Sequence, residues 1–172
     1  VHVAQMISDY QIDCEWVQNG YVMGALRPGA MAALDTKNQM YSEVGAKCRV
    51  IDKDEIEAIT GSPRFYGGWY HEEAGHMNPL SYARGLARAV MQEGGRVFTS
   101  SPVENVQPSN GKWAVRTPTG SVLADKVIFA TGAYTVGGWK NLDRSFRIMR
   151  VFVAATQPLD PETRKRVLPD NT

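Results

Sequence analysis

The segment that decides the fold reads Lys126-Val127-Ile128-Phe129-Ala130-Thr131-Gly132-Ala133-Tyr134. Its first half is a nearly unbroken apolar run, which is typical of a parallel strand covered on both faces of a sheet. Its second half begins with small residues, which let a backbone approach a ligand where larger side chains would clash. In open α/β sheets, ligands bind beyond the carboxyl ends of the parallel strands. We therefore expect a ligand at this strand end, with an ordinary tight turn as the alternative.

An amphipathic helix precedes this strand and is predicted over Asn78 to Glu93. Asn78 is suited to cap the helix, and proline at the first helical position fits the fixed φ of that residue. After the helix, Val97 and Phe98 predict a short buried strand. Three partly alternating segments separated by turns then predict a small antiparallel meander, and they cover Val103–Gln107, Lys112–Thr117 and Ser121–Ala124.

The rest of the chain shows short helical and strand patterns. Asn19-Gly20 is a strong hairpin signal and lies between two expected strands, Cys14–Val17 and Tyr21–Met23. Helices are expected over residues 3–10, from Pro28 to about Gly45, after Asp52, and near the C-terminus over 160–168. Further strands are expected near the aromatic residues 65–70 and over Val151–Thr156.

Composition excludes several classes of function. The chain has 172 residues, of which 43% are hydrophobic, and its 19 basic and 18 acidic side chains give a net charge of +1. A balanced charge does not favour binding to nucleic acid, and no apolar run has the length of a membrane span. Cys14 and Cys48 predict free thiols in a reducing cytoplasm. Because the chain opens with Val1-His2-Val3 rather than methionine, we expect it to be a segment of a longer protein.

Motifs for common chemistries are absent. The sequence contains no nucleophile elbow, phosphate-binding P-loop or paired cysteines, and its 16 glycines do not form GxGxxG. In His71-Glu72-Glu73-Ala74-Gly75-His76 the second histidine lies one residue too far for a helical zinc site, so no metal site is predicted. Trp69, Tyr70 and His71 could face a substrate, but core packing explains them equally well. The catalytic residues therefore stay unassigned.

Several segments together resemble the middle of the D-amino-acid oxidase (DAO) family of FAD-dependent oxidoreductases. The resemblance rests on these residues, in this order: His76-Met77-Asn78-Pro79, Tyr82-Ala83-Arg84-Gly85-Leu86-Ala87-Arg88-Ala89, Gly94-Gly95-Arg96-Val97, Ser101-Pro102-Val103-Glu104-Asn105-Val106, Trp113-Ala114-Val115-Arg116-Thr117, and Ala124 through Tyr134. Cys14-Glu15-Trp16 and Val153 through Leu159 are similar to the family's substrate lobe, more loosely.

The resemblance implies a mixed α/β (α+β) fold. Residues 76–145 would form part of an FAD-binding α/β lobe with an antiparallel meander. Residues 1–75 would form part of a substrate-binding lobe that contains helices, and residues 146–172 would return to the sheet of that lobe. The implied cofactor-binding residues are Val103, whose backbone would meet the adenine, and Ala130, Thr131 and Gly132, which would lie against the dinucleotide. The implied reaction is hydride transfer to FAD from the carbon of a C–N bond in an amine or amino acid.

The family's amino-terminal βαβ unit and its carboxy-terminal part have no counterpart in this sequence. We therefore expect that the isolated chain neither retains FAD nor turns over substrate. One alternative is a non-catalytic binding or scaffold domain derived from a flavoprotein. Another is a relative of the FAD-dependent hydroxylases, which share the small-residue strand end. The substrate, the electron acceptor and the oligomeric state are not predicted.

Overall fold

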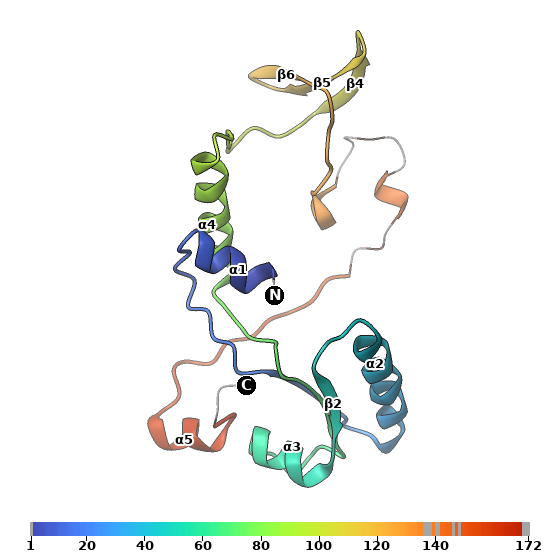
Figure 1. Cartoon of the computed structure of the whole chain (residues 1–172), viewed down its shortest axis with the longest axis vertical. Coiled ribbons are helices and arrows are strands. Elements are labelled where there is room, and N and C mark those ends of the chain that lie inside the picture. The colour runs from blue at the N-terminus through green and yellow to red at the C-terminus, as the bar shows by residue number, and fades with distance from the viewer. Residues whose placement is uncertain (1, 136–138, 140–141, 146, 148, 170–172) are drawn as a thin grey trace. The chain divides into compact units, whose positions relative to one another are not determined.

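The computed structural model describes residues 2–135, 139, 142–145, 147 and 149–169 (Figure 1). The chain forms two compact units. Unit 1 contains Val1–Gly95 and Thr156–Thr172, and unit 2 contains Arg96–Ala155. The family lobes expected over 1–75, 76–145 and 146–172 stay a prediction, because a compact unit of this chain need not coincide with a lobe of the family.

Helices make up much of unit 1, and unit 2 contains two short 3-10 turns. The helical elements of unit 1 are α1 (His2–Asp9), η1 (Pro28–Ala30), α2 (Met31–Glu43), α3 (Lys53–Thr60), α4 (Pro79–Gln92) and α5 (Pro161–Arg166). The turns of unit 2 are η2 (Gly132–Tyr134) and η3 (Leu142–Ser145). The helices expected at the start of the chain, after Pro28, after Asp52, after Asn78 and near the C-terminus are all confirmed.

Unit 1 is built on a sheet of three short strands: β1 (Tyr21–Gly24), β2 (Cys48–Ile51) and β3 (Gly68–His71). The order is β1-β3-β2, and both outer strands run antiparallel to β3. In the centre, Trp69 lies opposite residues of both outer strands and is 2% exposed. Directly opposed residues share one face of a sheet, so the indole of Trp69 anchors the core on that face.

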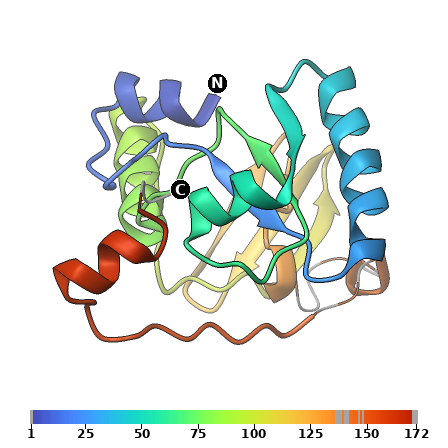
Figure 2. The ribbon, with the colours of Figure 1, turned by 90° about the horizontal axis from the view of Figure 1, so that it is seen from below.

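Helices α2 and α3 pack on opposite faces of this sheet (Figure 2). On one face, the core cluster joins Leu34 of α2 to Ala25 and Trp69. On the other face, Ile56 of α3 is fully buried, and a Cβ built on Gly68 would lie 2.6 Å from its Cδ1 atom. Because neighbouring residues of a strand point to opposite faces, the adjacent Gly68 and Trp69 place one helix on each side.

A charged pair fastens β2 to α3. Arg49 donates from Nη1 to Oε2 of Glu55 at 2.7 Å, and its other terminal nitrogen bonds the second carboxylate oxygen. The hydrogen bonds from Arg49 lower the pKa of Glu55, and the Glu55 carboxylate in turn raises the pKa of Arg49. The Arg49 guanidinium also lies 5.4 Å from the ring centre of Tyr70, on the α3 side of the sheet.

Helix α4 begins at the predicted cap and lies beside α1 (Figures 1 and 2). The Asn78 side chain accepts a hydrogen bond from the backbone N–H of Ser81, with an O···N distance of 3.1 Å. Gly85 in the middle of α4 lets the helix approach Ile12, since a Cβ there would lie 2.2 Å from the Ile12 Cγ2 atom. A glycine at this helix position therefore serves close packing.

We expect the substitution Asn78→Ala to lower the free energy of unfolding of unit 1 by about 1 kcal/mol, because it removes the helix cap. Asn78→Asp keeps an acceptor at the same position and is the matched control. Urea unfolding followed by far-UV circular dichroism measures both variants. Equal losses of stability in the two variants would contradict a capping role for this side chain.

Unit 2 contains the predicted meander, formed by β4 (Asn105–Ser109), β5 (Lys112–Thr117) and β6 (Gly120–Ala124). Its strands pair in sequence order and antiparallel, which confirms the prediction. The β4–β5 turn places Asn110 at φ 50° and Gly111 at φ 77°, a left-handed conformation that these two residue types tolerate best.

Three predicted strands are wrong for this chain. Val97–Phe98, Lys126–Ala130 and Val151–Thr156 belong to no strand of the described residues. Their apolar composition suits a covered strand, but a strand also needs a hydrogen-bonded neighbour. Large apolar side chains consequently remain uncovered, and Ile128 is 89% exposed and Phe152 99% exposed.

The expected amino-terminal hairpin is also wrong. Val17 forms only an isolated antiparallel bridge with His76, and β1 pairs with β3 instead of with the preceding residues. The N–H of Gly20 donates to the carbonyl of Ala74 at 2.9 Å. The residues around Asn19-Gly20 therefore lie beside the segment that contains Ala74 and His76. Val50 and Ile51 belong to β2, where no strand is predicted from the sequence.

Candidate functional site

Unit 2 contains a cavity of about 490 Å³ between the meander and the segment that follows it. Two stretches of chain form it. The first enters the meander and the second is the extended segment that ends in η2. The lining residues are Ser101, Pro102, Val103, Val106, Val115, Val127, Ile128, Phe129, Thr131, Tyr134 and Thr135.

The cavity brings together two of the four residues predicted to bind a cofactor. Val103 and Thr131 both line it, although 27 residues separate them in the sequence. Ala130 and Gly132 flank Thr131 in the chain but do not line the cavity. The structure thus places all four residues at or next to one site, and their role in binding stays a prediction.

Hydrogen bonds within the turn fix the end of the extended segment. The N–H of Tyr134 donates to the carbonyl of Thr131 at 3.0 Å. The Thr135 hydroxyl donates to the carbonyl of Gly132 at 2.9 Å and shares a further hydrogen bond with the Thr131 hydroxyl. The two threonines therefore stabilise this turn from both ends.

Gly132 leaves the backbone of the turn open. Its φ of 51° lies in the left-handed region that favours glycine, and a Cβ built there would meet no atom within 4 Å. In this chain, the space next to Gly132 is therefore available to a ligand.

The lining of the cavity is suited to an uncharged group. Its lining residues are apolar or hydroxyl-bearing, and none of them carries a formal charge. Val106 is buried and Val115 half-buried, so one wall is firmly packed within the unit. Pockets of this kind bind ligands through apolar contact, with a few polar groups setting orientation.

Some residues of the cavity wall are not predicted from the sequence to bind a ligand. Val115, Ile128 and Tyr134 line the cavity but were not singled out as binding residues. Alternation in the meander predicts that Val115 points to one face, but it does not reveal which segment covers that face. Tyr134 directly follows the small-residue motif, and its place next to that motif is the sequence feature that could have marked it as a binding residue.

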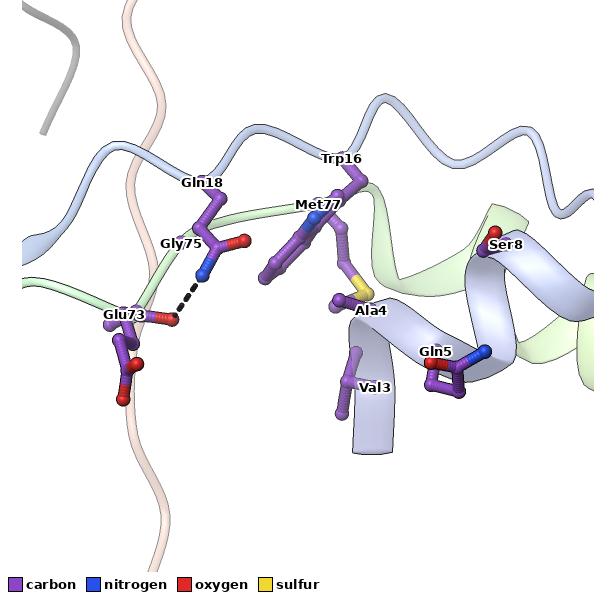
Figure 3. A pocket seen from close by; sticks show the side chains of 10 residues that line it. Val3, Ala4, Gln5, Ser8, Trp16, Gln18, Glu73, Gly75 and Met77 are labelled. Carbon is purple, nitrogen blue, oxygen red and sulfur yellow. Dashed lines mark hydrogen bonds between the residues drawn. The ribbon is translucent and has the colours of Figure 1, made fainter. Parts of the chain in front are cut away.

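Unit 1 has a larger cavity of about 640 Å³ (Figure 3). Figure 3 shows the Met77 side chain extending toward Ala4 of α1. The Trp16 ring instead reaches Gly75, where an added Cβ would lie 3.0 Å from its Cη2 atom. The Gln18 amide donates to the carbonyl of Glu73 at 3.0 Å and thereby ties two of its walls together. The cavity contains none of the predicted site residues and no pair of groups arranged for acid–base chemistry.

The three possible substrate-facing residues of β3 do not converge. Trp69 is buried beneath α2, and His71 lies on the same face with its ring centre 5.6 Å from that of Trp69. Tyr70 points to the opposite face, where Arg49 covers its ring. Core packing therefore accounts for Trp69, and the structure assigns no catalytic residue.

Neither a metal-binding cluster nor a membrane-spanning helix occurs among the described residues. Among them, no group of three or more histidine, cysteine, aspartate or glutamate side chains is arranged to hold a metal ion. None of the helices in this part of the chain combines the length and apolar character needed to cross a membrane.

Comparison with known proteins gives a family match. Residues 2–171 match the model of the family described as FAD dependent oxidoreductase (DAO). The chain is 31% identical over 163 residues to the probable oxidoreductase OrdL of Haemophilus influenzae, covering 91% of this chain and 38% of that protein. It is 32% identical over 133 residues to γ-glutamylputrescine oxidoreductase of Escherichia coli, covering 77% of this chain and 31% of that protein. The chain therefore spans well under half the length of these relatives.

The fold is similar to that of solved flavoenzymes. Glycine oxidase from Geobacillus kaustophilus superimposes with a TM-score of 0.63 at 18% identity, covering 77% of this chain and 36% of that one. At this identity the likeness concerns the fold alone. It confirms the expected partial α/β flavoprotein fold, and the family match confirms the resemblance noted from the sequence.

Proposed function

Because the chain belongs to the DAO family of FAD-dependent oxidoreductases, we propose that it supplies the adenine side of an FAD site in an enzyme that oxidises a C–N bond of an amine or amino acid. The observation that carries this proposal is that Val103 and Thr131 line the same uncharged, largely apolar cavity. The amine and amino-acid substrates in the names of γ-glutamylputrescine oxidoreductase and glycine oxidase support the substrate class.

A bound FAD would supply the redox chemistry, as acceptor of the hydride from the carbon of the C–N bond, and the protein would supply position and electrostatics. The residues of this chain would contact the adenine end of the cofactor, which is the end remote from the reacting flavin ring. The Val103 backbone would meet the adenine edge, and the buried Val106 side chain would keep water away from its face. Thr131 would fix the turn, and Gly132 would let the dinucleotide approach.

The residues of this chain fit the adenine ring of FAD better than they fit its pyrophosphate. A neutral apolar cavity suits the adenine ring. A pyrophosphate is usually held by a glycine-rich turn at a helix N-terminus, and this sequence has no GxGxxG. The uncovered apolar side chains of Ile128 and Phe152 also support the view that further sheet elements complete the fold. A catalytically complete site therefore needs more than these residues.

We expect the isolated chain to purify without flavin, because its sequence lacks the glycine-rich turn that usually holds the pyrophosphate. An absorbance spectrum of the purified chain should lack the visible bands of oxidised flavin. Added amines and amino acids should not be oxidised. Stoichiometric flavin in the isolated chain would contradict this expectation.

The test of the proposed function uses the polypeptide encoded by the complete reading frame that contains this chain. It should carry FAD and oxidise at least one member of a panel of amines and amino acids. A complete polypeptide without flavin would favour the scaffold alternative, and hydroxylation of an aromatic substrate would favour the hydroxylase alternative. A cytoplasmic location is part of the proposal, and the free thiols of Cys14 and Cys48 support it.

A further inference from the structure

Tyr134 is an unusual member of the cavity wall. It lines the cavity, yet its side chain is 89% exposed. Its ring makes none of the aromatic contacts found among the described residues, which in unit 2 join Trp113, Phe129 and Trp139. Among the described residues, the Tyr134 ring is therefore largely uncovered.

The backbone that carries this ring is well fixed. The N–H of Tyr134 bonds to Thr131, and the N–H of Thr135 bonds to the carbonyl of Gly132 at 3.3 Å. Only two side-chain torsions of the tyrosine then remain to be ordered when a ligand binds. Tyrosine gives a large contact area at a low cost in conformational entropy for this reason.

The remaining walls favour a planar base. Val103, Val106 and Val115 contribute apolar surface, and no charged side chain lines the cavity. A phosphate group would gain no ion pair here, whereas a purine would gain apolar contact on one face and an aromatic ring on the other. Stacking of a base on an aromatic side chain depends on the π-face that every base has.

We propose that Tyr134 stacks on the adenine of the bound dinucleotide and closes the cavity over it. This inference rests on the proposed function, which places the adenine in this cavity. It assigns to Tyr134 a specificity role: the site recognises the base of an adenine nucleotide rather than its phosphates. The isolated chain should consequently bind AMP weakly, although it does not retain FAD.

The experiment titrates the isolated chain with AMP and follows the tyrosine ring resonances by NMR. The Tyr134 signal is identified by its absence from Tyr134→Phe. We expect this signal to shift on addition of AMP, and Tyr134→Ala to weaken AMP binding about tenfold, within the range measured for loss of one aromatic stack. Tyr134→Phe should bind within about twofold of the unmodified chain, because the ring is retained. Inorganic pyrophosphate should not compete.

A matched control is Tyr66→Ala, which removes another exposed tyrosine, in unit 1. It should leave AMP binding unchanged. The proposal is overturned if Tyr134→Ala binds AMP as well as the unmodified chain does, if the unmodified chain binds no AMP, or if pyrophosphate competes. Because Tyr134 is exposed, its truncation removes little packing, and the amide spectrum verifies that each variant is folded.

Failure of this inference can be distinguished from failure of the proposed function. The same variants are made in the polypeptide of the complete reading frame, where flavin content and FAD affinity are measured. Absence of flavin from the unmodified polypeptide contradicts the proposed function. Normal flavin content with an FAD affinity that does not respond to Tyr134→Ala contradicts only the stacking.

Discussion

Replacing Trp69 by alanine should lower the free energy of unfolding of unit 1 by about 3–5 kcal/mol, the range found for truncation of large buried aromatic residues. The indole is 2% exposed and lies on the central strand beneath α2. The Trp69 ring centre is 5.0 Å from the ring centre of Tyr41. The Lys37 ammonium lies 4.5 Å from the Trp69 ring centre. Its N–H donates to the Asn38 side chain at 3.2 Å.

The expected loss is large compared with the total stability of a domain, which is about 5–15 kcal/mol. Chemical unfolding followed by circular dichroism measures it. Tyr66→Ala serves as the control, because Tyr66 precedes the same strand but is 54% exposed, and an exposed substitution usually changes stability by less than about 0.5 kcal/mol. Equal unfolding midpoints for Trp69→Ala and Tyr66→Ala would show that Trp69 does not anchor the core.

A second variant separates packing from hydrogen bonding. Trp69→Phe keeps an aromatic ring between the sheet and α2 but removes the indole N–H that bonds to Asn38. The loss in free energy of unfolding for Trp69→Phe should lie between the losses for Trp69→Ala and for the control Tyr66→Ala. A loss as large as that of Trp69→Ala would mean that the indole hydrogen bond, rather than ring burial, determines stability at this position.

Local signals in the sequence predicted local structure well. Asn78-Pro79 begins α4, and the side chain of Asp52 caps α3 by accepting a hydrogen bond from the N–H of Glu55 at 2.9 Å. Asn110-Gly111 forms the first turn of the meander. In each case the deciding interactions lie within four residues, so the sequence contains all the information that they require.

Strand pairing was predicted less well because it depends on distant segments. The apolar run Lys126–Ala130 indicates that its side chains tend to be covered, but it does not identify the neighbouring strand. Asn19-Gly20 is a hairpin signal in isolation, yet the N–H of Gly20 bonds to Ala74, and the strand that follows it pairs with β3. Tertiary contacts override local preference at both places.

At the candidate site, too, local features were predicted from the sequence and contacts between distant segments were not. The small residues around Gly132 were recognised from the sequence because a close backbone approach requires them. The expectation that Val103 and Thr131 serve one cofactor came from resemblance to a family, since nothing in their spacing predicts that they line the same cavity. The meander brings Val115 to the same cavity, and this followed only from the three-dimensional structure.

Replacing Gly132 by alanine should reduce the FAD affinity of the complete polypeptide at least about tenfold, which corresponds to roughly 1.4 kcal/mol of binding free energy. A Cβ at this position meets no atom of the chain within 4 Å. The added methyl group would instead occupy the space between the backbone and the dinucleotide. The expected effect therefore arises from the cofactor and not from crowding within the protein.

Gly111→Ala is a closely matched control for this substitution. Gly111 also has a positive φ, at 77°, and a Cβ there likewise meets no atom within 4 Å. Alanine at either position should cost about 1–2 kcal/mol of stability through left-handed backbone strain. Gly111 lies in the β4–β5 turn, and neither of its chain neighbours lines the cavity, whereas Gly132 adjoins the lining residue Thr131. Gly111→Ala should therefore leave FAD affinity unchanged. Flavin titration of the two apoproteins separates the effects, and equal affinities would show that the dinucleotide does not approach Gly132.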